Sequence, residues 1–292
     1  MKCEFEEKQF ESALNSSLAS NHHLIYAVGQ YLENTVGFDA ALVTHNRRFW
    51  RLFPHVSPWY ARAFGFYPEG VELQNDWWQS LSQQVDYFPP LKFNVFIQHK
   101  RPFFRNGTAT VEWQHWQEAY YKYQLTTHQQ QALAQLSGRI AAAGVVVYAS
   151  PAFYKYSDLW NAIRDNSLLD QTNFCEAHRL NNHSSYSYIS GGNVGIGHST
   201  PERIEGVHFS EHIKRLKSLK RESKGNKEII IHWGEIVQQS ALESKRIQAA
   251  YRHILADLTK DVAESRLATA FMRLEAFCFV TNSACFFGID EN

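Results

Sequence analysis

The clearest hydrophobic pattern in this chain predicts a strand, a helix and a second strand in the middle of the sequence. An apolar run opens the strand predicted over residues 93–100. Residues 145–149 form a short continuous apolar run, which is typical of a strand buried on both faces, and Pro151 is expected to end it. Between the strands, apolar residues recur at helical spacing over residues 127–143, and Gly144 is expected to cap this helix.

The N-terminal third predicts helix, then a strand, then an insertion. Residues 4–35 have a helical pattern that is broken near residues 16–21, with an apolar stripe in the second piece. Residues 38–43 alternate as a strand does. Residues 44–90 are rich in aromatic side chains and contain prolines without a steady period, so we interpret them as an insertion of short elements packed by aromatics.

The C-terminal part changes character. Residues 181–201 are polar and rich in turn formers, which favours a hairpin or a surface loop, and the chain after them is expected to be helical. Its longest amphipathic segment covers residues 229–258. The predicted order is therefore α-β-insertion-β-α-β over residues 1–160, followed by a loop-rich and then helical region over residues 161–292. That region either stands apart or packs as one domain with the core.

Composition narrows the choice of protein class. The 292 residues contain 29 Lys+Arg and 29 Asp+Glu, so the net charge indicates neither nucleic acid nor membrane as a partner. The four cysteines form no Cys-x-x-Cys pair and are too sparse for a disulfide framework. The first residues are charged rather than apolar, and no apolar run reaches 18 residues. We expect a soluble, cytoplasmic protein that does not enter a membrane.

Candidate chemistry begins at Gln98-His99-Lys100, where the strand over residues 93–100 ends. Because a strand places residues i and i+2 on the same face, Gln98 and Lys100 are expected to project together while His99 points away. A carbonyl oxygen beside an ammonium at the end of a buried strand suits a charged ligand. The alternative is a strand end that emerges into solvent, with the lysine stem covering apolar surface.

Two acidic residues upstream complete a candidate metal site. Glu33 lies in the helical pattern, and Asp39 lies in the strand that follows it. Two carboxylates, with the amide oxygen of Gln98 or a neighbouring main-chain carbonyl, suit Mg²⁺ or Mn²⁺, which polarises a phosphate and lowers the pKa of a bound water. Lys100 would orient the attacking water and stabilise developing negative charge. Asp86 is an alternative acid, but Asp39 is preferred because it lies inside an apolar strand pattern whereas Asp86 precedes two prolines.

Helix-borne Glu33, strand-borne Asp39 and Gln98-x-Lys100 resemble the active site of the PD-(D/E)xK nucleases, the restriction-endonuclease-like superfamily. The resemblance is strongest to the Q-x-K branch that includes Mrr-type restriction enzymes. The segments GFDAAL, FIQHKRP and VVVYASPAF are similar to uncharacterised bacterial defence-type nucleases. The resemblance covers about half of the chain. It departs from the family in one respect, because Asp39 and Gln98 are 59 positions apart rather than a hairpin length.

The resemblance implies a restriction-endonuclease-like core, with a mixed central sheet flanked by helices, and a Mg²⁺-dependent endonuclease that acts on DNA in restriction or anti-phage defence. The competing hypothesis is a catalytically inactive module of the same fold that binds nucleic acid or scaffolds a partner protein. Retention of both acids and the lysine favours activity. The helical C-terminal region is a candidate surface for a partner protein or for homo-oligomerisation.

Two further patterns remain open. A basic run near the start of the helical region offers up to five contacts to a phosphate backbone, although such runs are often solvated helix faces. Its cationic residues are Lys214, Arg215, Lys217, Lys220 and Arg221. Cys175-x-x-His178, with His183 and His198, has the residue types of a zinc site. The spacing matches no strong zinc signature, so a buried cysteine and surface histidines are the preferred interpretation.

Overall fold

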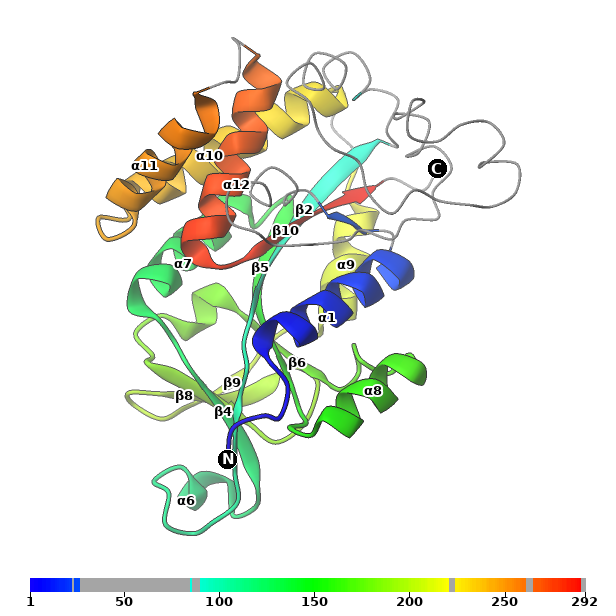
Figure 1. The fold of residues 1–292 in the computed structure, drawn as a ribbon, viewed down its shortest axis with the longest axis vertical. Helices are drawn as coiled ribbons and strands as arrows, with labels where there is room; N and C mark the ends of the chain where they lie inside the picture. Colours follow the sequence, from blue (N-terminus) through cyan, green and yellow to red (C-terminus); the bar gives the residue numbers. More distant parts are fainter. Residues whose placement is uncertain (23, 27–84, 86–89, 221–223, 261–264, 290–292) are drawn as a thin grey trace.

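The computed structural model describes residues 1–22, 24–26, 85, 90–220, 224–260 and 265–289 (Figure 1). The elements of its N-terminal half are α1 (Glu7–His22), β1 (Leu24–Tyr26), β2 (Leu91–His99), β3 (Phe103–Arg105), α6 (Trp113–Trp116), β4 (Tyr120–Gln124), α7 (Thr127–Ile140) and β5 (Gly144–Pro151). Those that follow are α8 (Tyr156–Arg164), β6 (Thr172–Glu176), the 3₁₀ turn η2 (Ala177–Leu180), β7 (Ser185–Tyr188), β8 (Val194–His198), β9 (Glu202–Glu205), α9 (Phe209–Ser218), α10 (Asn226–Glu243), α11 (Gln248–Thr259), α12 (Arg266–Thr281) and β10 (Ala284–Ile289).

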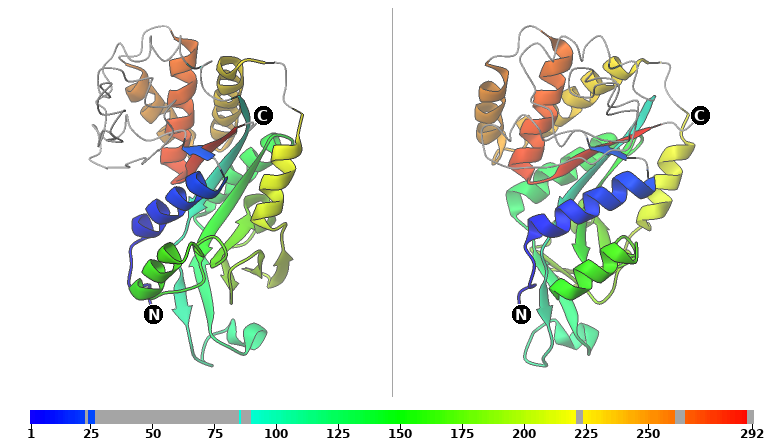
Figure 2. Two further views of the ribbon diagram at one scale, coloured as in Figure 1. Left: turned by 90° about the vertical axis from the view of Figure 1, so that its right-hand side faces the viewer. Right: turned by 45° about the vertical axis from the view of Figure 1, so that its right-hand side comes forward.

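These elements form a mixed α/β fold with two sheets. The first sheet has the strand order β1-β10-β2-β5-β6, in which β2 and β5 are parallel and the other neighbours are antiparallel. The second sheet has the order β3-β4-β7-β8-β9 and is antiparallel throughout. Helices α10–α12 lie near the upper end of the molecule in every view, and the second sheet lies near the lower end (Figures 1 and 2).

The first sheet is buried on both faces. Phe96 of β2 belongs to a core that also includes side chains of α7, α10, α11 and α12. Its neighbours Val95 and Ile97 point the other way, into a core shared with α1, α8 and α9. Because successive strand residues face opposite sides, burial of both faces requires the continuous apolar run that the sequence shows here.

Tyrosine side chains join the second sheet to the first. Tyr123, Tyr186 and Tyr188 lie on one face of the second sheet and are all buried. The ring centroids of Tyr123 and Tyr148 of β5 are 5.9 Å apart in a stacked arrangement. The Tyr188 hydroxyl donates to the Ser150 hydroxyl, also on β5, at 2.7 Å. Pairing each phenol with a ring or an acceptor allows these bulky groups to be buried between sheets.

The structure confirms several predicted elements and corrects the assignment of Gly144. The strand at 93–100, the helix at 127–143 and the buried strand ending at Pro151 are present as β2, α7 and β5, and residues 181–201 contain the hairpin β7–β8. Gly144, which the sequence predicts as a helix cap, is instead the first residue of β5.

Other predictions are wrong at the two ends of the described chain. Residues 24–26, predicted as helix, form β1, which pairs with β10. The chain after residue 201, predicted as helical, also contributes β9 and β10, and β10 lies between β1 and β2. Both predicted regions of the chain therefore supply strands to the first sheet. The strand predicted over 38–43 lies outside the described residues, as does the insertion at 44–90 apart from residues 85 and 90. None of the described helices is long and apolar enough to span a membrane.

Candidate functional site

Gln98 is held in a fixed orientation at the end of β2. Its side chain is fully buried, and its Nε2 donates to the Thr281 carbonyl at 2.6 Å and to Gln129 Oε1 at 2.8 Å. A main-chain carbonyl can only accept a hydrogen bond, so the Thr281 contact fixes which end of the amide is nitrogen. Oε1 of Gln98 is buried and has no hydrogen-bond partner in the described structure. Such an orphaned acceptor costs stability unless a ligand satisfies it.

Lys100 follows β2 directly and is half-buried. Its Nζ lies 5.6 Å from the ring centroid of Tyr148, the residue that pairs with Gln98 across β2 and β5. Burial lowers the pKa of Lys100, and the charge of Glu7 opposes that shift. The backbone is fixed as well, since its N–H donates to the Ala149 carbonyl at 2.9 Å. A cation held this way, with part of its water shell removed, is a strong local source of positive potential.

Glu7, in the first turn of α1, connects the elements around Lys100. Its Oε2 accepts from the main-chain N–H of Arg101 at 3.2 Å, and its Oε1 accepts from the Asn282 side chain at 3.1 Å. Asn282 follows Thr281, whose carbonyl holds Gln98. We call this set the strand-end ring; it comprises Glu7, Gln98, Lys100, Arg101, Thr281 and Asn282.

His99 lies on the other side of β2, as predicted from strand alternation. Its ring packs edge-on against Phe10 of α1, with centroids 6.1 Å apart. Burial, assisted by the charge of Lys8, lowers the pKa of His99 to about 3. His99 is therefore neutral at pH 7 and belongs to the core beneath α1 rather than to the strand-end ring. The predicted shared face of Gln98 and Lys100 is confirmed, because Gln98 pairs with Tyr148 across the strands and the Lys100 ammonium lies over the ring of the same Tyr148.

The predicted acids Glu33, Asp39 and Asp86 lie outside the described residues, so their roles stay predictions. Both hydrogen-bonding edges of β2 are occupied, by β5 and by β10. Within the described part of the chain, no three His, Cys, Asp or Glu residues gather closely enough to hold a metal. The carboxylate that the structure brings to Lys100 is Glu7, which sequence reasoning missed. Its only sequence signal is an acidic residue in the first turn of a helix.

The basic run lies on α9 and just after it. Phe209, Ile213 and Leu216 face the core, which leaves Lys214 and Arg215 exposed on the outer side of the helix. Lys220 is also exposed, Lys217 is half-buried, and Arg221 lies outside the described residues. The exposed cations form a solvated helix face, and their contact with nucleic acid stays a prediction.

The cysteine and histidines considered for zinc do not converge. Cys175 is buried, and burial raises its pKa to about 12. His178 lies 3.3 Å from Ser137 Oγ, and His183 lies 3.4 Å from a Glu202 carboxylate oxygen. The preferred interpretation is right for the buried cysteine but wrong for His198, which is not a surface histidine because only 8% of it is exposed.

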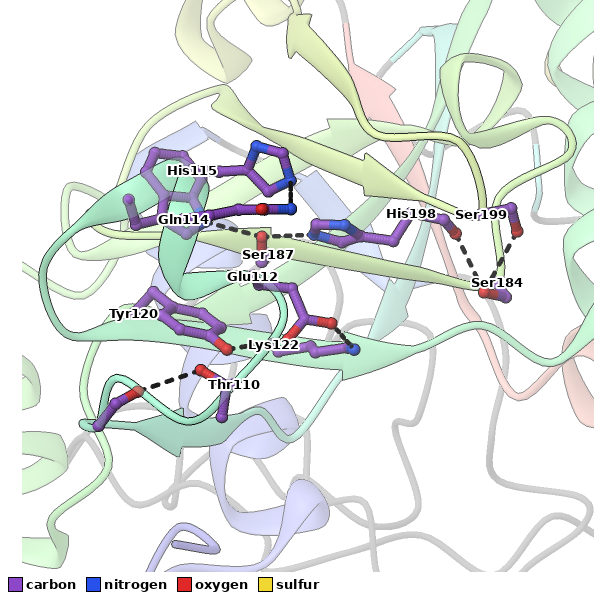
Figure 3. A network of polar contacts seen from close by, with 12 residues as sticks. Thr110, Glu112, Gln114, His115, Tyr120, Lys122, Ser184, Ser187, His198 and Ser199 are labelled. Atoms are coloured by element: carbon purple, nitrogen blue, oxygen red, sulfur yellow. Dashed lines mark hydrogen bonds and ion pairs between the residues drawn. The ribbon is translucent and has the colours of Figure 1, made fainter.

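His198 belongs to a second polar cluster, on the outer face of the second sheet (Figure 3). Its Nε2 lies 2.8 Å from Ser187 Oγ, which also accepts from the Trp116 indole N–H at 2.9 Å. Beside them, the Glu112 carboxylate pairs with the ammonium of Lys122. We call these five residues the serine–histidine cluster. Sequence analysis missed it because its members come from three separate segments without a recognisable spacing.

Charge and burial keep the serine–histidine cluster in a defined protonation state. Burial lowers the pKa of His198 to about 4, although the carboxylate of Glu112 opposes this shift. Burial acts to raise the pKa of Glu112, but hydrogen bonds from Lys122 and Tyr120 outweigh it and hold the value at about 2. At pH 7 the imidazole is therefore neutral and the carboxylate is ionised.

Searches with this chain against known protein families, curated proteins and solved structures find no match.

Proposed function

We propose that this protein is a metal-dependent nuclease that hydrolyses phosphodiester bonds in DNA, with its site at the carboxyl end of β2. The observation that supports this most strongly is the buried, orphaned Oε1 of Gln98 in the same ring of contacts as Lys100. A buried acceptor without a partner and a lysine with a lowered pKa are the features expected where a charged ligand binds.

The topology around this site also supports a restriction-endonuclease-like core. Strand β2 leads through a hairpin insertion and α7 to β5, which runs parallel to β2 in the same sheet. Gln98 and Lys100 lie where β2 ends, the position at which the resembling nucleases carry their Q-x-K residues. The sheet is mixed and helices cover both of its faces, as the resemblance implies.

The donor set suits Mg²⁺ or Mn²⁺. Both ions favour oxygen ligands, so Gln98 Oε1 would be one ligand, with carboxylates from Glu33 and Asp39, or from Asp86 as the alternative. When bound, such a cation polarises a phosphate and lowers the pKa of a coordinated water. Glu7 already bonds Asn282 and the backbone of Arg101, so its role in the proposal is to position the ring.

Lys100 would contribute charge stabilisation in the reaction. Its ammonium lies over the Tyr148 ring at the strand end, so the lysine side chain needs no large rearrangement as negative charge develops on the phosphate. The exposed cations on α9, Lys214 and Arg215, would add contacts to the phosphate backbone that weaken with salt.

An inactive nucleic-acid-binding or scaffolding module is the second candidate. The described residues contain no group of three metal-ligating side chains, and the acids that would complete a metal site lie outside them. The two candidates differ in whether Lys100 is needed for turnover or only for binding.

The deciding experiment incubates the purified chain with supercoiled plasmid, linear DNA and RNA, in the presence of Mg²⁺, Mn²⁺ or EDTA. We expect metal-dependent cleavage of DNA that falls by about 100-fold or more in Lys100→Met and Gln98→Leu variants. Lys155→Met serves as the matched control because Lys155 is an exposed lysine at the start of α8, far along the chain from the site. Cleavage that survives loss of Lys100 would contradict the site assignment.

Metal binding is measured separately from activity. Titration of Mn²⁺, followed by electron paramagnetic resonance, is expected to show weaker binding in Gln98→Leu and in whichever of Glu33→Gln, Asp39→Asn and Asp86→Asn removes the true acid. DNA binding without cleavage by the wild-type chain under all metal conditions would favour the inactive module instead.

A further inference from the structure

The segment between β3 and β4 covers the outer face of the second sheet. In that sheet, Lys122 of β4 pairs with Ser187 of β7, so their side chains rise from the same face. The buried Tyr123, Tyr186 and Tyr188 point to the opposite face, toward the first sheet. Helix α6 lies over the outer face and contributes Trp116, whose indole N–H bonds Ser187. The serine–histidine cluster is therefore enclosed between a sheet and a short covering segment.

The contacts of Ser187 are those of an activated hydroxyl. Oγ accepts a hydrogen bond from Trp116 at 2.9 Å and lies 2.8 Å from His198 Nε2 (Figure 3). The imidazole is neutral at pH 7, so its Nε2 can carry a lone pair when the other nitrogen holds the proton. In that tautomer the serine O–H donates to Nε2. A hydroxyl in contact with a neutral imidazole is the nucleophile–base pair of nucleophilic catalysis, and the Glu112 carboxylate acts on this imidazole through its charge while bonding Lys122 and Tyr120.

We propose that Ser187 and His198 form a second catalytic site, in which Ser187 is the nucleophile and His198 the general base for hydrolysis of small acyl esters. The covering segment limits the substrate to a small acyl group, because the Ser187 side chain is fully buried when α6 is in place. This site uses none of the residues of the strand-end ring and does not depend on the nuclease proposal.

The reaction balances without a cofactor. Ser187 Oγ forms a bond to the carbonyl carbon as its proton passes to His198 Nε2, and the carbonyl electron pair moves to oxygen. The tetrahedral intermediate collapses, the bond to the alkoxy oxygen breaks, and the proton on His198 passes to the departing alcohol. Water then attacks the acyl-serine while His198 takes one of its protons; the bond between the acyl carbon and Ser187 Oγ breaks, and His198 returns the proton to Oγ, which releases the acid and restores the serine hydroxyl.

The neighbouring charges act on these steps in opposite directions. Burial lowers the pKa of His198 and so disfavours the imidazolium that forms when it takes the proton; the Glu112 carboxylate offsets part of this effect, whereas the charge of Lys122 adds to it. Lys122, which pairs with Glu112 and rises beside Ser187, supplies positive charge near the developing oxyanion. The indole N–H of Trp116 keeps one lone pair of Oγ occupied and so orients the hydroxyl toward His198.

The covering segment is held by polar contacts rather than by buried apolar surface: Trp116 bonds Ser187, and Glu112 pairs with Lys122 and accepts from Tyr120. None of the four residues of α6 is buried, and a side chain added at Gly107 would meet nothing within 4 Å. Gln117, which ends α6, has a left-handed backbone with φ of 55°, an uncommon conformation for a residue with a side chain. Opening of this segment would break the contacts of Trp116 and Glu112 but expose little apolar surface, and it gives a substrate its route to Ser187.

The test uses the full chain and a small serine-directed probe, diisopropyl fluorophosphate. We expect a single adduct by intact mass, which peptide mapping places on Ser187, at a rate at least 10-fold above that of the His198→Gln variant. Ser199→Ala is the matched control, because Ser199 is exposed and lies next to His198 in the sequence; its labelling is expected to equal that of the wild type. Wild-type labelling is informative even if a variant fails to fold.

Turnover is measured with p-nitrophenyl acetate at pH 7 to 8. Hydrolysis is expected to persist in EDTA, to stop after the probe has reacted, and to be lost in Ser187→Ala. Absence of an adduct on Ser187 after prolonged exposure to millimolar probe would overturn the proposal, as would an adduct that forms equally fast in His198→Gln. In either case the Ser187–His198 hydrogen bond serves only to join β7 and β8.

Discussion

At the scale of single residues, the strand-end ring combines features that a core does not need. Gln98 uses both amide hydrogens and leaves its oxygen buried and without a partner. Lys100 is half-buried although a lysine at a strand end could extend into solvent. Each feature costs stability, since buried polar groups are favourable only when they are satisfied. Residues retained at such a cost are expected to act on a ligand.

Lys100→Met is expected to separate activity from stability. Methionine has a similar length and no charge to desolvate, so the free energy of unfolding should stay the same or rise by up to about 1 kcal/mol. DNA cleavage should fall by about 100-fold or more, because the charge near the phosphate is lost. Urea denaturation and the plasmid assay measure the two quantities. A large loss of stability in this variant would mean that Lys100 has a structural role instead.

The contacts of Glu176 make the free energy of unfolding depend on pH. Its carboxylate lies 2.9 Å from His212 Nε2 and also contacts Arg179; burial acts to raise its pKa, but these contacts outweigh burial and lower it to about 2. The folded state therefore binds the proton less readily than the unfolded state, whose value is near 4.5. The stabilisation is complete above pH 4.5 and is lost as the pH falls toward 2.

We expect Glu176→Gln to lower the free energy of unfolding by about 2–3 kcal/mol at pH 7, with a difference from the wild type that shrinks between pH 4.5 and 2. The control is Glu205→Gln, since Glu205 pairs with Arg203 on the surface at 2.7 Å. Its effect is expected to stay below about 0.5 kcal/mol. Urea unfolding at several pH values gives both curves, and a Glu176 effect that did not change with pH would rule out this origin.

At the scale of elements, the site depends on how β2 and β5 lie side by side. Both strands are almost fully buried, and their parallel register places Gln98 opposite Tyr148. The crossover helix α7 supplies Gln129 to the same amide. The strand, helix and strand that the hydrophobic pattern predicts are therefore the elements that build one side of the ring.

Alanine substitutions at two glycines, one in β5 and one in α7, test how closely β5 approaches β2. A Cβ at Gly144 would lie 2.1 Å from Asn94 Oδ1 and 2.7 Å from its carbonyl oxygen, so Gly144→Ala is expected to force β5 away from β2. We expect a loss of about 2–3 kcal/mol in the free energy of unfolding. Gly138→Ala, in α7, meets nothing within 4 Å and should gain about 0.5–1 kcal/mol. Thermal and urea unfolding of both variants measure these changes. An equal change in the free energy of unfolding of the two variants would contradict the close approach of Gly144 to Asn94.

At the scale of the whole molecule, the C-terminal strand joins the two ends of the described chain. β10 lies between β1 and β2, and its last residues pair near the start of β2. Thr281 and Asn282, directly before it, complete the strand-end ring. Folding of the site therefore requires contacts between residues at opposite ends of the sequence. Such long-range contacts form more slowly than local structure.

A chain that ends at Asn282 is expected to lose cooperative unfolding, because removal of β10 leaves facing edges of β1 and β2 without their partner. A chain that ends at Ile289 keeps the whole of β10 and is the control, with an expected transition like that of the full chain. Calorimetry and far-ultraviolet circular dichroism distinguish them. An intact transition in the shorter chain would show that β10 is dispensable.

The sequence by itself determined β2, α7 and β5, and with them the common face of Gln98 and Lys100. These features are local, because apolar residues repeat every 2 positions in a strand and every 3.6 in a helix, and this spacing involves only residues close together in the sequence. The same local reasoning misassigned residues 24–26 and Gly144. Three apolar residues are too few to separate strand from helix, and a glycine after a helix has the same appearance whether it caps the helix or admits a neighbouring strand.

Only the tertiary structure decided which distant residues meet. The carbonyl that orients Gln98 lies 183 positions away, and no local pattern marks it. Glu7, the central place of β10 and the contact between Ser187 and His198 were likewise set by packing across the chain. Strand order and side-chain encounters depend on which apolar faces cover one another, a property of the whole molecule that short-range periodicity does not contain.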